Sequence, residues 1–362
     1  MIDTRDNAML KEMLGIKHAI IQAPMAGGIT TAELVAGVSD AGGLGVIGGG
    51  SLEAPALSKL IRQVKKKTSH SFGVNLFVPW HFEVTTADMA RAFDTLKPVY
   101  DKLGIEQQPI APVAPETVEE RFEQQIDAVI EERVPVCSFI FGIPDNHHIE
   151  RLKEAGIVLL GTATTVREAE AIERAGFDAV VMQGAEAGGH RGSFLQEVEE
   201  SLNGLISLIP ETRDHINIPL IAAGGIMDGR GIAAARILGA SGVQLGTAFL
   251  STEESGAHKV HKEALSKDRD TPSVLTRLFT GRAARAVRNR FIQEMTGRDE
   301  HVVEYPVHRK LTQPIQDASK KEGSTEYAML LAGQGKNMAR YLPVKSLIAK
   351  LVGETETFNI EI

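Results

Sequence analysis

The stretch from Val158 to Gln183, VLLGTATTVREAEAIERAGFDAVVMQ, holds a complete strand–helix–strand unit. The apolar runs at its two ends predict strands. Between them, Thr165 is expected to cap a helix, because a threonine oxygen accepts a free backbone N–H at a helix start, and Gly176 is expected to end that helix. The apolar residues of the helix fall on one face, which is typical of a helix lying on a sheet.

The same alternation runs along the whole 362-residue chain. Strand-like runs lie at residues 19–25, 44–47, 72–77, 136–141, 158–161, 179–183, 220–223 and 243–249. Helices fit between them, including one over 32–41 that Thr30 or Thr31 caps and one that Asn146 caps and that runs to residue 155. Eight parallel strands joined by right-handed crossovers predict an α/β protein with a (β/α)8 TIM barrel.

A doubly wound open sheet is the competing fold. Its first strand is normally followed by a G-x-G-x-x-G turn, whereas Pro24-Met-Ala-Gly-Gly28 stands at this place in the chain. The barrel is therefore the fold that we expect.

A long excursion from the barrel pattern follows the third strand, over about residues 78–135. It contains two predicted helices, 88–103 and 116–132, on either side of a proline-rich passage at 109–115. Excursions at the strand C-termini of a barrel lie at the mouth of its active site, where they act as covers or as packing units.

A C-terminal extension, residues 271–362, follows the barrel domain that we expect over 1–270. The extension is expected to be helical, with one helix over 346–352, and to pack near the active-site mouth. Its basic stretch, Arg282 to Arg290, is most simply interpreted as a solvated face.

Composition excludes several classes of partner. The formal net charge of −8 disfavours nucleic acid and anionic membranes, since both attract basic surfaces, and leaves small molecules as the expected partners. The single cysteine, Cys137, lies in an apolar run, which predicts a buried thiol and fits a reducing compartment. No apolar run reaches the ~18–20 residues of a membrane span and no signal-peptide pattern is present, so we expect a cytoplasmic protein. The sequence indicates no oligomeric state.

Two glycine-bearing segments follow the last two predicted strands. Barrels often bind a phosphate with the backbone N–H groups of these two loops, which small residues leave accessible. The segments contain Gly224 and Gly225 in the first loop, and Gln244, Leu245, Gly246 and Thr247 in the second. They predict a phosphate site.

A flat polar ring fits the opposite side of the barrel opening. Asn75 in the third strand and Gln183 in the sixth are expected to hydrogen-bond to its heteroatoms, while the turn after the first strand faces its plane or edge. The turn residues are Ala23, Pro24, Met25 and Ala26. A flat ring with a single phosphate tail predicts FMN as the cofactor.

His190 follows the sixth strand, where the catalytic residues of barrels belong. Its imidazole is the candidate acid or base, and Gly188 and Gly189 before it let the backbone approach a ligand. Glu186 is expected to be structural or solvated. The glycines between Glu186 and His190 argue against a helix and no third ligand is evident, so we expect neither zinc nor another metal here.

Five motifs resemble, in this order, those of the nitronate monooxygenase family, formerly called 2-nitropropane dioxygenases. The motifs are Ile21-Gln-Ala-Pro-Met-Ala-Gly27, Phe72-Gly-Val-Asn-Leu-Phe77, Gln183-Gly-Ala-Glu-Ala-Gly-Gly-His-Arg-Gly192, Ile221-Ala-Ala-Gly-Gly-Ile226 and Gly242-Val-Gln-Leu-Gly-Thr247. The match runs from about residue 14 to about residue 295. The resemblance implies an FMN-bound barrel that oxidises alkyl nitronates with dioxygen to a carbonyl compound and nitrite. The flavin contacts that it implies are Asn75, Gln183, Gly188, Gly224 and the segment 244–247, with His190 as the active-site histidine.

The role of His190 has two alternatives under this resemblance. A nitronate already carries a negative charge, so electron loss to FMN can begin without proton abstraction, and His190 then binds the anion. Toward a neutral nitroalkane, the same imidazole acts as the base that removes the Cα proton.

Other functions share nearly the same motifs. The flavin-dependent enoyl-acyl-carrier-protein reductase II and NAD(P)H:quinone reductases have them too, and would use a nicotinamide donor. A flavin- or phosphate-binding module without catalysis is a third interpretation. Arg191 has no assigned role, and the pair His147-His148 is expected to be solvated.

Overall fold

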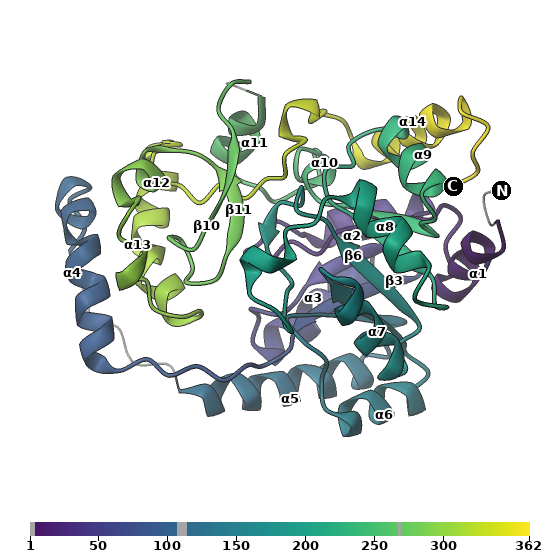
Figure 1. The fold of residues 1–362 in the computed structure, drawn as a ribbon, viewed down its shortest axis with the longest axis horizontal. Helices are drawn as coiled ribbons and strands as arrows, with labels where there is room; N and C mark the ends of the chain where they lie inside the picture. Colours follow the sequence, from purple (N-terminus) through teal and green to yellow (C-terminus); the bar gives the residue numbers. More distant parts are fainter. Residues whose placement is uncertain (1–3, 107–113, 267–268) are drawn as a thin grey trace.

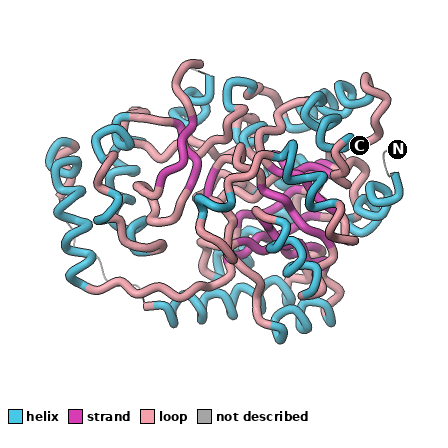
Figure 2. The backbone as a smooth tube through the Cα atoms, viewed as in Figure 1, coloured by secondary structure: helices cyan, strands magenta, loops and turns pink. Residues whose placement is uncertain are grey.

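The computed structural model describes residues 4–106, 114–266 and 269–362. An eight-stranded parallel sheet has the order β1-β9-β8-β6-β5-β4-β3-β2, and a bridge between Ile21 and Leu44 joins its two edges (Figures 1 and 2). The predicted TIM barrel is therefore confirmed. Its strands are β1 (Ile20–Gln22), β2 (Gly45–Gly48), β3 (Phe72–Phe77), β4 (Val136–Ile140), β5 (Val158–Ala163), β6 (Ala179–Gln183), β8 (Leu220–Ala223) and β9 (Gly242–Leu245).

Two of the predicted strands are shorter than expected. β1 ends at Gln22, just before Pro24, whose nitrogen cannot donate to a strand ladder. β9 ends at Leu245, and residues Thr247–Leu250 form the short helix α10. A short buried apolar run has the same sequence pattern in a strand and in a helix, which explains why the last strand was predicted to extend to residue 249.

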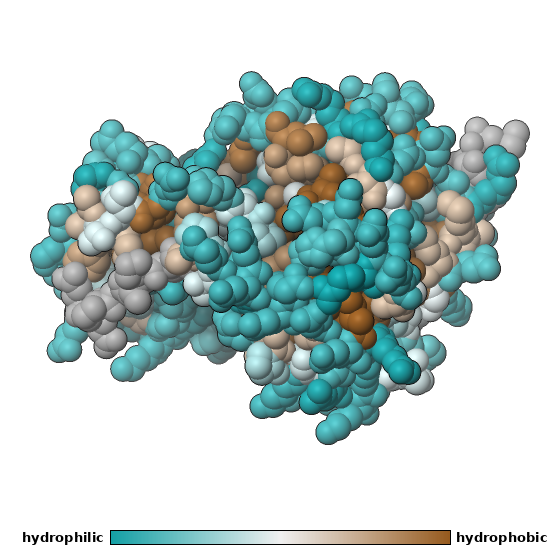
Figure 3. Space-filling model, turned by 90° about the horizontal axis from the view of Figure 1, so that it is seen from below, coloured by the Kyte–Doolittle hydropathy of each residue, from teal (hydrophilic) through white to brown (hydrophobic). Residues whose placement is uncertain are grey.

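Helices surround the barrel as the alternation predicts. Thr31 and Thr165 cap their helices by accepting the N–H groups of Leu34 and Glu168, whereas Asn146 is a first helical residue rather than a cap. The helices are α1 (Thr4–Leu14), α2 (Ala32–Asp40), α3 (Ala54–Lys65), α5 (Pro115–Glu131), α6 (Asn146–Glu154), α7 (Val166–Arg174), α8 (Leu205–Arg213) and α9 (Gly229–Ile237). The face seen in Figure 3 is mostly hydrophilic, with apolar side chains in small separate patches.

The last helix of the chain, α14 (Val344–Glu356), also lies on the barrel. It contacts α9 and α2, and its Leu347, Ile348 and Leu351 belong to the barrel's apolar core. The two termini consequently lie near each other at the right edge of Figure 1.

A second apolar core lies beside the barrel mouth, at the left of Figure 1. We call the unit around it the outer lobe, residues 82–105 and 273–331. It contains α4 (Thr86–Lys102), β10 (Ser273–Thr276), β11 (Ala284–Val287), α12 (Arg290–Met295) and α13 (Val307–Glu322). Between barrel and lobe, α11 (Lys259–Ser266) packs in a third, smaller cluster. Parts of both excursions from the barrel thus build one unit, although residues 109–113 of the proline-rich passage lie outside the described residues.

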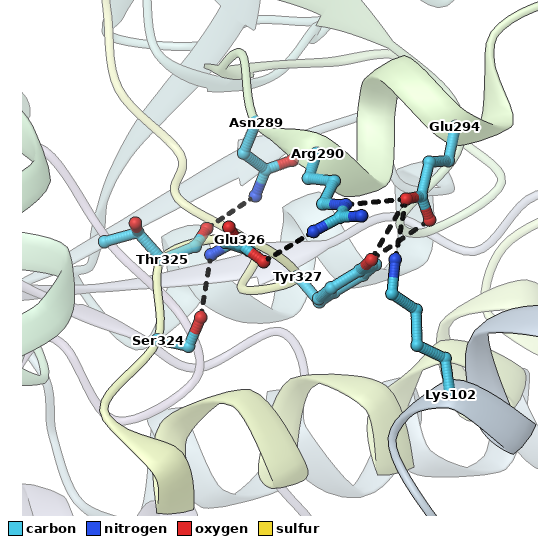
Figure 4. Close-up of polar contacts among 8 residues, drawn as sticks. All are labelled: Lys102, Asn289, Arg290, Glu294, Ser324, Thr325, Glu326 and Tyr327. Carbon is cyan, nitrogen blue, oxygen red and sulfur yellow. Dashed lines mark hydrogen bonds and ion pairs between the residues drawn. The ribbon is translucent and has the colours of Figure 1, made fainter.

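Polar contacts fasten α4 to the C-terminal part of the outer lobe (Figure 4). Glu294 on α12 accepts from Lys102 at 2.9 Å, from Arg290 at 2.7 Å and from the Tyr327 hydroxyl at 3.0 Å. Arg290 also pairs with Glu326 at 3.4 Å. The excursion after β3 is therefore joined to segments almost 200 residues later in the chain.

An antiparallel sheet, β10-β11-β7, joins the outer lobe to the loop after β6, and the sequence did not predict it. Its third strand, β7 (Gly189–His190), carries the candidate histidine. The prediction of a solvated basic face over 282–290 is therefore wrong for the part of the stretch that forms β11. Arg285 in the central strand is buried and donates to Ala185 O and Ser273 O, whereas Arg288 is exposed.

Burial bears on one smaller expectation. Cys137 is fully buried in β4, and burial raises the pKa of its thiol, so the predicted inert core thiol is confirmed. Among the described residues, no helix is both long and apolar enough to cross a membrane.

Candidate active site

A cavity of about 440 Å³ opens at the C-terminal ends of the barrel strands, where TIM barrels hold their active sites. Every residue that the sequence singled out as a contact or a catalyst lines it. These are Ala23, Pro24, Met25, Ala26, Asn75, Gln183, Gly188, Gly189, His190, Gly224, Gly225, Gln244, Leu245, Gly246 and Thr247. Segments distant in sequence therefore meet at one site.

The loop after β8 needs glycine at both of its lining positions. Gly224 has φ +130° and Gly225 has φ +66°, backbone conformations that residues with a side chain rarely adopt. They bring the backbone to the cavity wall that also contains Thr247, which begins α10 after β9. This wall is backbone and small side chains, the kind of surface that receives a phosphate.

A third segment, residues 332–335, completes this wall and was missed from the sequence. Gly333 N donates to Thr247 Oγ1 at 3.0 Å, and Gln334 N donates to Glu186 O at 2.9 Å. Gly188 lies so close that an added Cβ would sit 2.4 Å from Gly333 N. The run Ala-Gly-Gln-Gly was the available signal, since repeated glycine marks a close backbone approach.

The loop that carries His190 is fixed by two buried polar side chains. Gln183 donates to His190 O and accepts from Gly192 N, both at 2.9 Å. Arg191, only 1% exposed, donates to the carbonyl oxygens of Gln183, Gly184 and Ser201. Burial lowers the pKa of Arg191 to about 10, so the guanidinium stays charged at neutral pH. Arg191 thus has a structural role, which the sequence alone had left open.

His190 lies partly buried at the cavity, with its ring between two aromatic side chains. The ring centroids of Phe141 and Tyr305 are 5.9 and 5.7 Å from that of the imidazole, both edge-on. Nε2 lies 2.9 Å from Thr280 Oγ1. Phe141 itself has φ +79°, an uncommon conformation for a bulky residue and one often found at functional sites.

The charge around His190 is positive. The Arg282 guanidinium lies 3.9 Å from the Phe141 ring centroid, and Arg309 lines the cavity with Nη1 buried and without a partner among the described residues. Burial, together with the charges of Arg282 and Arg309, lowers the pKa of His190 to about 3. None of the described residues that line the cavity carries a carboxylate. The site therefore favours anionic ligands and keeps the imidazole neutral.

Thr280, Tyr305, Arg309 and Gln313 also line the cavity and were missed from the sequence. They come from the outer lobe, about 90 to 120 residues after His190. Arg309 and Gln313 are four residues apart on α13, which places them on one face of that helix, and Tyr305 lies just before it. That spacing was the only local signal for them.

Other titratable residues named from the sequence lie apart from the reaction centre. Glu186 Oε1 accepts from Leu205 N at 2.9 Å, a structural bond that anchors α8. His148 is buried, contrary to the expectation that both histidines of the pair are solvated, and its Nε2 lies 2.6 Å from Glu123 Oε2. His147 is exposed as expected. Potential metal-ligand atoms of Glu123, His147 and His148 lie within 4.8 Å of one another, but Arg151 already pairs with Glu123.

Comparison with known proteins places the chain in a family. The family model described as nitronate monooxygenase matches residues 7–354. The chain belongs to the nitronate monooxygenase family. A probable nitronate monooxygenase of Staphylococcus haemolyticus (strain JCSC1435) is 47% identical and covers 97% of this chain and 98% of its own length. One of Staphylococcus aureus (strain MSSA476) is 44% identical, with coverage of 95% and 96%.

Solved structures resemble the whole chain. Nitroalkane oxidase from Streptomyces ansochromogenes is 38% identical with a TM-score of 0.88, over 97% of this chain and 98% of that one. FabK from Thermotoga maritima is 32% identical with a TM-score of 0.74, over 99% and 98%. The protein is accordingly an oxidoreductase of a flavoenzyme family.

Proposed function

We propose that this protein oxidises alkyl nitronates with dioxygen, using FMN, to a carbonyl compound and nitrite. The observation that carries the proposal is the cavity itself. One wall is backbone and small residues, the other holds a neutral imidazole beside guanidinium groups, and no carboxylate lines it among the described residues. A cofactor phosphate and an anionic nitronate both suit these surroundings.

The residues present fit FMN. The phosphate would lie at the backbone of Gly224, Gly225, Gly246 and Thr247, and the ring between Asn75 and the turn after β1. An added Cβ on Gly189 would meet no atom within 4 Å, so the absence of a side chain there leaves open space. When bound, the flavin supplies the redox chemistry, taking electrons from the nitronate and passing them to dioxygen.

The chain's own residues would bind and orient the substrate. The unpartnered Nη1 of Arg309 is available to donate to the nitro or nitronate oxygens, because a buried guanidinium N–H without an acceptor is costly. Phe141 and Tyr305 flank His190 and exclude water from that end of the cavity. The relative named nitroalkane oxidase supports an alkyl nitro compound as the substrate type.

A reductase is the second candidate, supported by the likeness to FabK over nearly the whole chain. Such an enzyme would reduce an enoyl thioester or a quinone with a nicotinamide donor. The cavity does not separate the two, since both need a flavin and an open face above it.

Anaerobic mixing distinguishes these functions. FMN-loaded protein is mixed with ethyl nitronate, NADH or NADPH, and the visible flavin absorbance is followed. We expect rapid bleaching by ethyl nitronate and slow or no bleaching by the nicotinamides. Rapid bleaching by NADH or NADPH, with none by the nitronate, would overturn the proposal in favour of the reductase.

A further inference from the structure

The hydrogen bonds around Thr280 determine which nitrogen of His190 carries the proton. Thr280 Oγ1 donates to Arg282 O at 3.0 Å and accepts from Arg282 N at 3.3 Å. The same oxygen lies 2.9 Å from His190 Nε2. A hydroxyl has one proton, and a carbonyl oxygen can only accept. With that proton given to Arg282 O, Thr280 Oγ1 can only accept from His190, so Nε2 must be the donor.

We propose that Thr280 is a positioning residue that holds His190 as its Nε2–H tautomer, leaving Nδ1 as the base for neutral nitroalkanes. The proposal rests on the proposed function and deepens it, because it adds proton abstraction from a nitroalkane to the oxidation of its nitronate. In a neutral imidazole one nitrogen donates and the other accepts, so fixing Nε2–H necessarily frees the Nδ1 lone pair.

The ring is held against rotation, which makes the assignment specific. His190 pairs with Ala284 of β11, close along the chain to Thr280 and Arg282, so β7 and this turn move as one unit. The edges of Phe141 and Tyr305 border the imidazole, and Gln183 holds the His190 carbonyl. Among the described residues, Nδ1 of His190 has no hydrogen-bond partner, while the side chain lines the cavity.

The step is a simple proton transfer. The Cα–H bond of the nitroalkane breaks, the proton passes to Nδ1, and the electron pair of the bond moves into the nitro group to give the nitronate anion. The charged groups that face the imidazole and the nitroalkane are Arg282 and Arg309. Both disfavour the imidazolium but stabilise the nitronate oxygens as negative charge develops on them, which is the role of preorganised cations in such steps. The nitronate is then the substrate of the oxidation.

The test compares two substrates and two variants. Thr280→Val removes the hydroxyl and nearly keeps the shape, and Thr280→Ser restores the hydroxyl. We expect Thr280→Val to lower kcat/KM for nitroethane by about 10- to 100-fold, and by a clearly smaller factor for preformed ethyl nitronate, which needs no proton abstraction. Thr280→Ser should recover most of the nitroethane activity. FMN content and circular dichroism check that each variant is folded and loaded.

A spectroscopic measurement reports the tautomer of His190 directly. Protein labelled with ¹⁵N-histidine, with the His190 signals identified by their loss in His190→Asn, should show a protonated Nε2 and a lone-pair Nδ1 at neutral pH. In Thr280→Val the two tautomers should mix. A wild-type Nδ1–H signal, or equal losses with both substrates in Thr280→Val, would overturn the inference.

The two proposals fail in different ways. If the wild-type protein oxidises ethyl nitronate but not nitroethane, His190 is no base and only this inference falls. If it oxidises neither substrate, the proposed function itself falls, whatever tautomer the spectrum shows.

Discussion

The electrostatics of the site depend strongly on Arg309. Its buried Nη1 has no partner among the described residues, and its charge is one of the two that lower the pKa of His190. Burial also lowers the pKa of Arg309 itself. A cation held in this state without an acceptor is stabilised when an anionic ligand arrives.

Replacing Arg309 with leucine should therefore have two effects. KM for ethyl nitronate should rise about 10-fold or more, because a charge-assisted hydrogen bond is lost. The pKa of His190 should rise from about 3. Since a base works only when unprotonated, the acid limb of the pH profile of kcat/KM for nitroethane should move to higher pH.

Arg288→Leu is the matched control, since it removes an exposed guanidinium of the same outer lobe, just after β11. It should change neither KM nor the acid limb. An unchanged KM and pH profile in Arg309→Leu would show that Arg309 does not face the substrate.

At the residue scale, the sequence revealed those residues of the site that belong to local motifs. Gln183 to His190 form one continuous run, and Gly224 and Gly225 stand side by side, so strand ends and glycine pairs point to them. Thr280 and Arg309 are single polar residues in the outer lobe. Apart from the four-residue spacing of Arg309 and Gln313, nothing in the neighbouring sequence distinguishes them from surface residues, and only tertiary packing brings them to the cavity.

At the scale of elements, the close contact of the loop before β7 with residues 332–335 shapes the phosphate wall. Gly188 permits it, since an added Cβ would lie 2.4 Å from Gly333 N and 2.6 Å from Ala332 C. Both neighbours are backbone atoms, which cannot swing aside as a flexible side chain can.

Gly188→Ala should therefore push the two segments apart and weaken FMN binding. We expect a loss of about 1–3 kcal/mol in the stability of the loaded protein, the usual cost of overpacking, and a higher Kd for FMN in a fluorescence titration. Gly353→Ala in α14 is the control, because its added Cβ meets nothing within 4 Å. It should stabilise the fold by about 0.5–1 kcal/mol and leave FMN affinity alone. Equal FMN affinity in both variants would contradict the assignment of this wall to the phosphate.

The barrel elements were predictable because the strand–helix units repeat an apolar period, and several also have a cap and a glycine stop. The sheet β10-β11-β7 was not. β7 has only two residues, and the arginines of the basic stretch concealed the strand β11. Arg285 can be buried because backbone carbonyls accept its hydrogen bonds, and no sequence pattern indicates such partners.

For the whole molecule, the outer lobe is held by its apolar core more than by its ion pairs. Leu96 of α4 is fully buried in that core. The Lys102 and Glu294 side chains, by contrast, are 39% and 35% exposed, so solvent screens their interaction.

Leu96→Ala should destabilise the protein by about 2–5 kcal/mol, and Glu294→Gln by less than about 1 kcal/mol, measured by urea unfolding. Hydrogen bonds from Lys102 and neighbouring groups lower the pKa of Glu294 to about 2, below its ordinary value of 4.5. Its stabilisation is therefore present above about pH 4.5 and lost as the pH falls toward 2, where wild type and Glu294→Gln should converge. A larger effect of Glu294→Gln than of Leu96→Ala at neutral pH would contradict this order.

The most direct test of the central claim is nitrite release from ethyl nitronate by the FMN-loaded protein in air. We predict nitrite formation accompanied by oxygen uptake and dependent on both the nitronate and dioxygen, with no requirement for NADH or NADPH. If no nitrite appears, while NADH or NADPH is oxidised in the presence of a quinone or an enoyl thioester, the protein is a reductase and does not oxidise nitronates in this cavity.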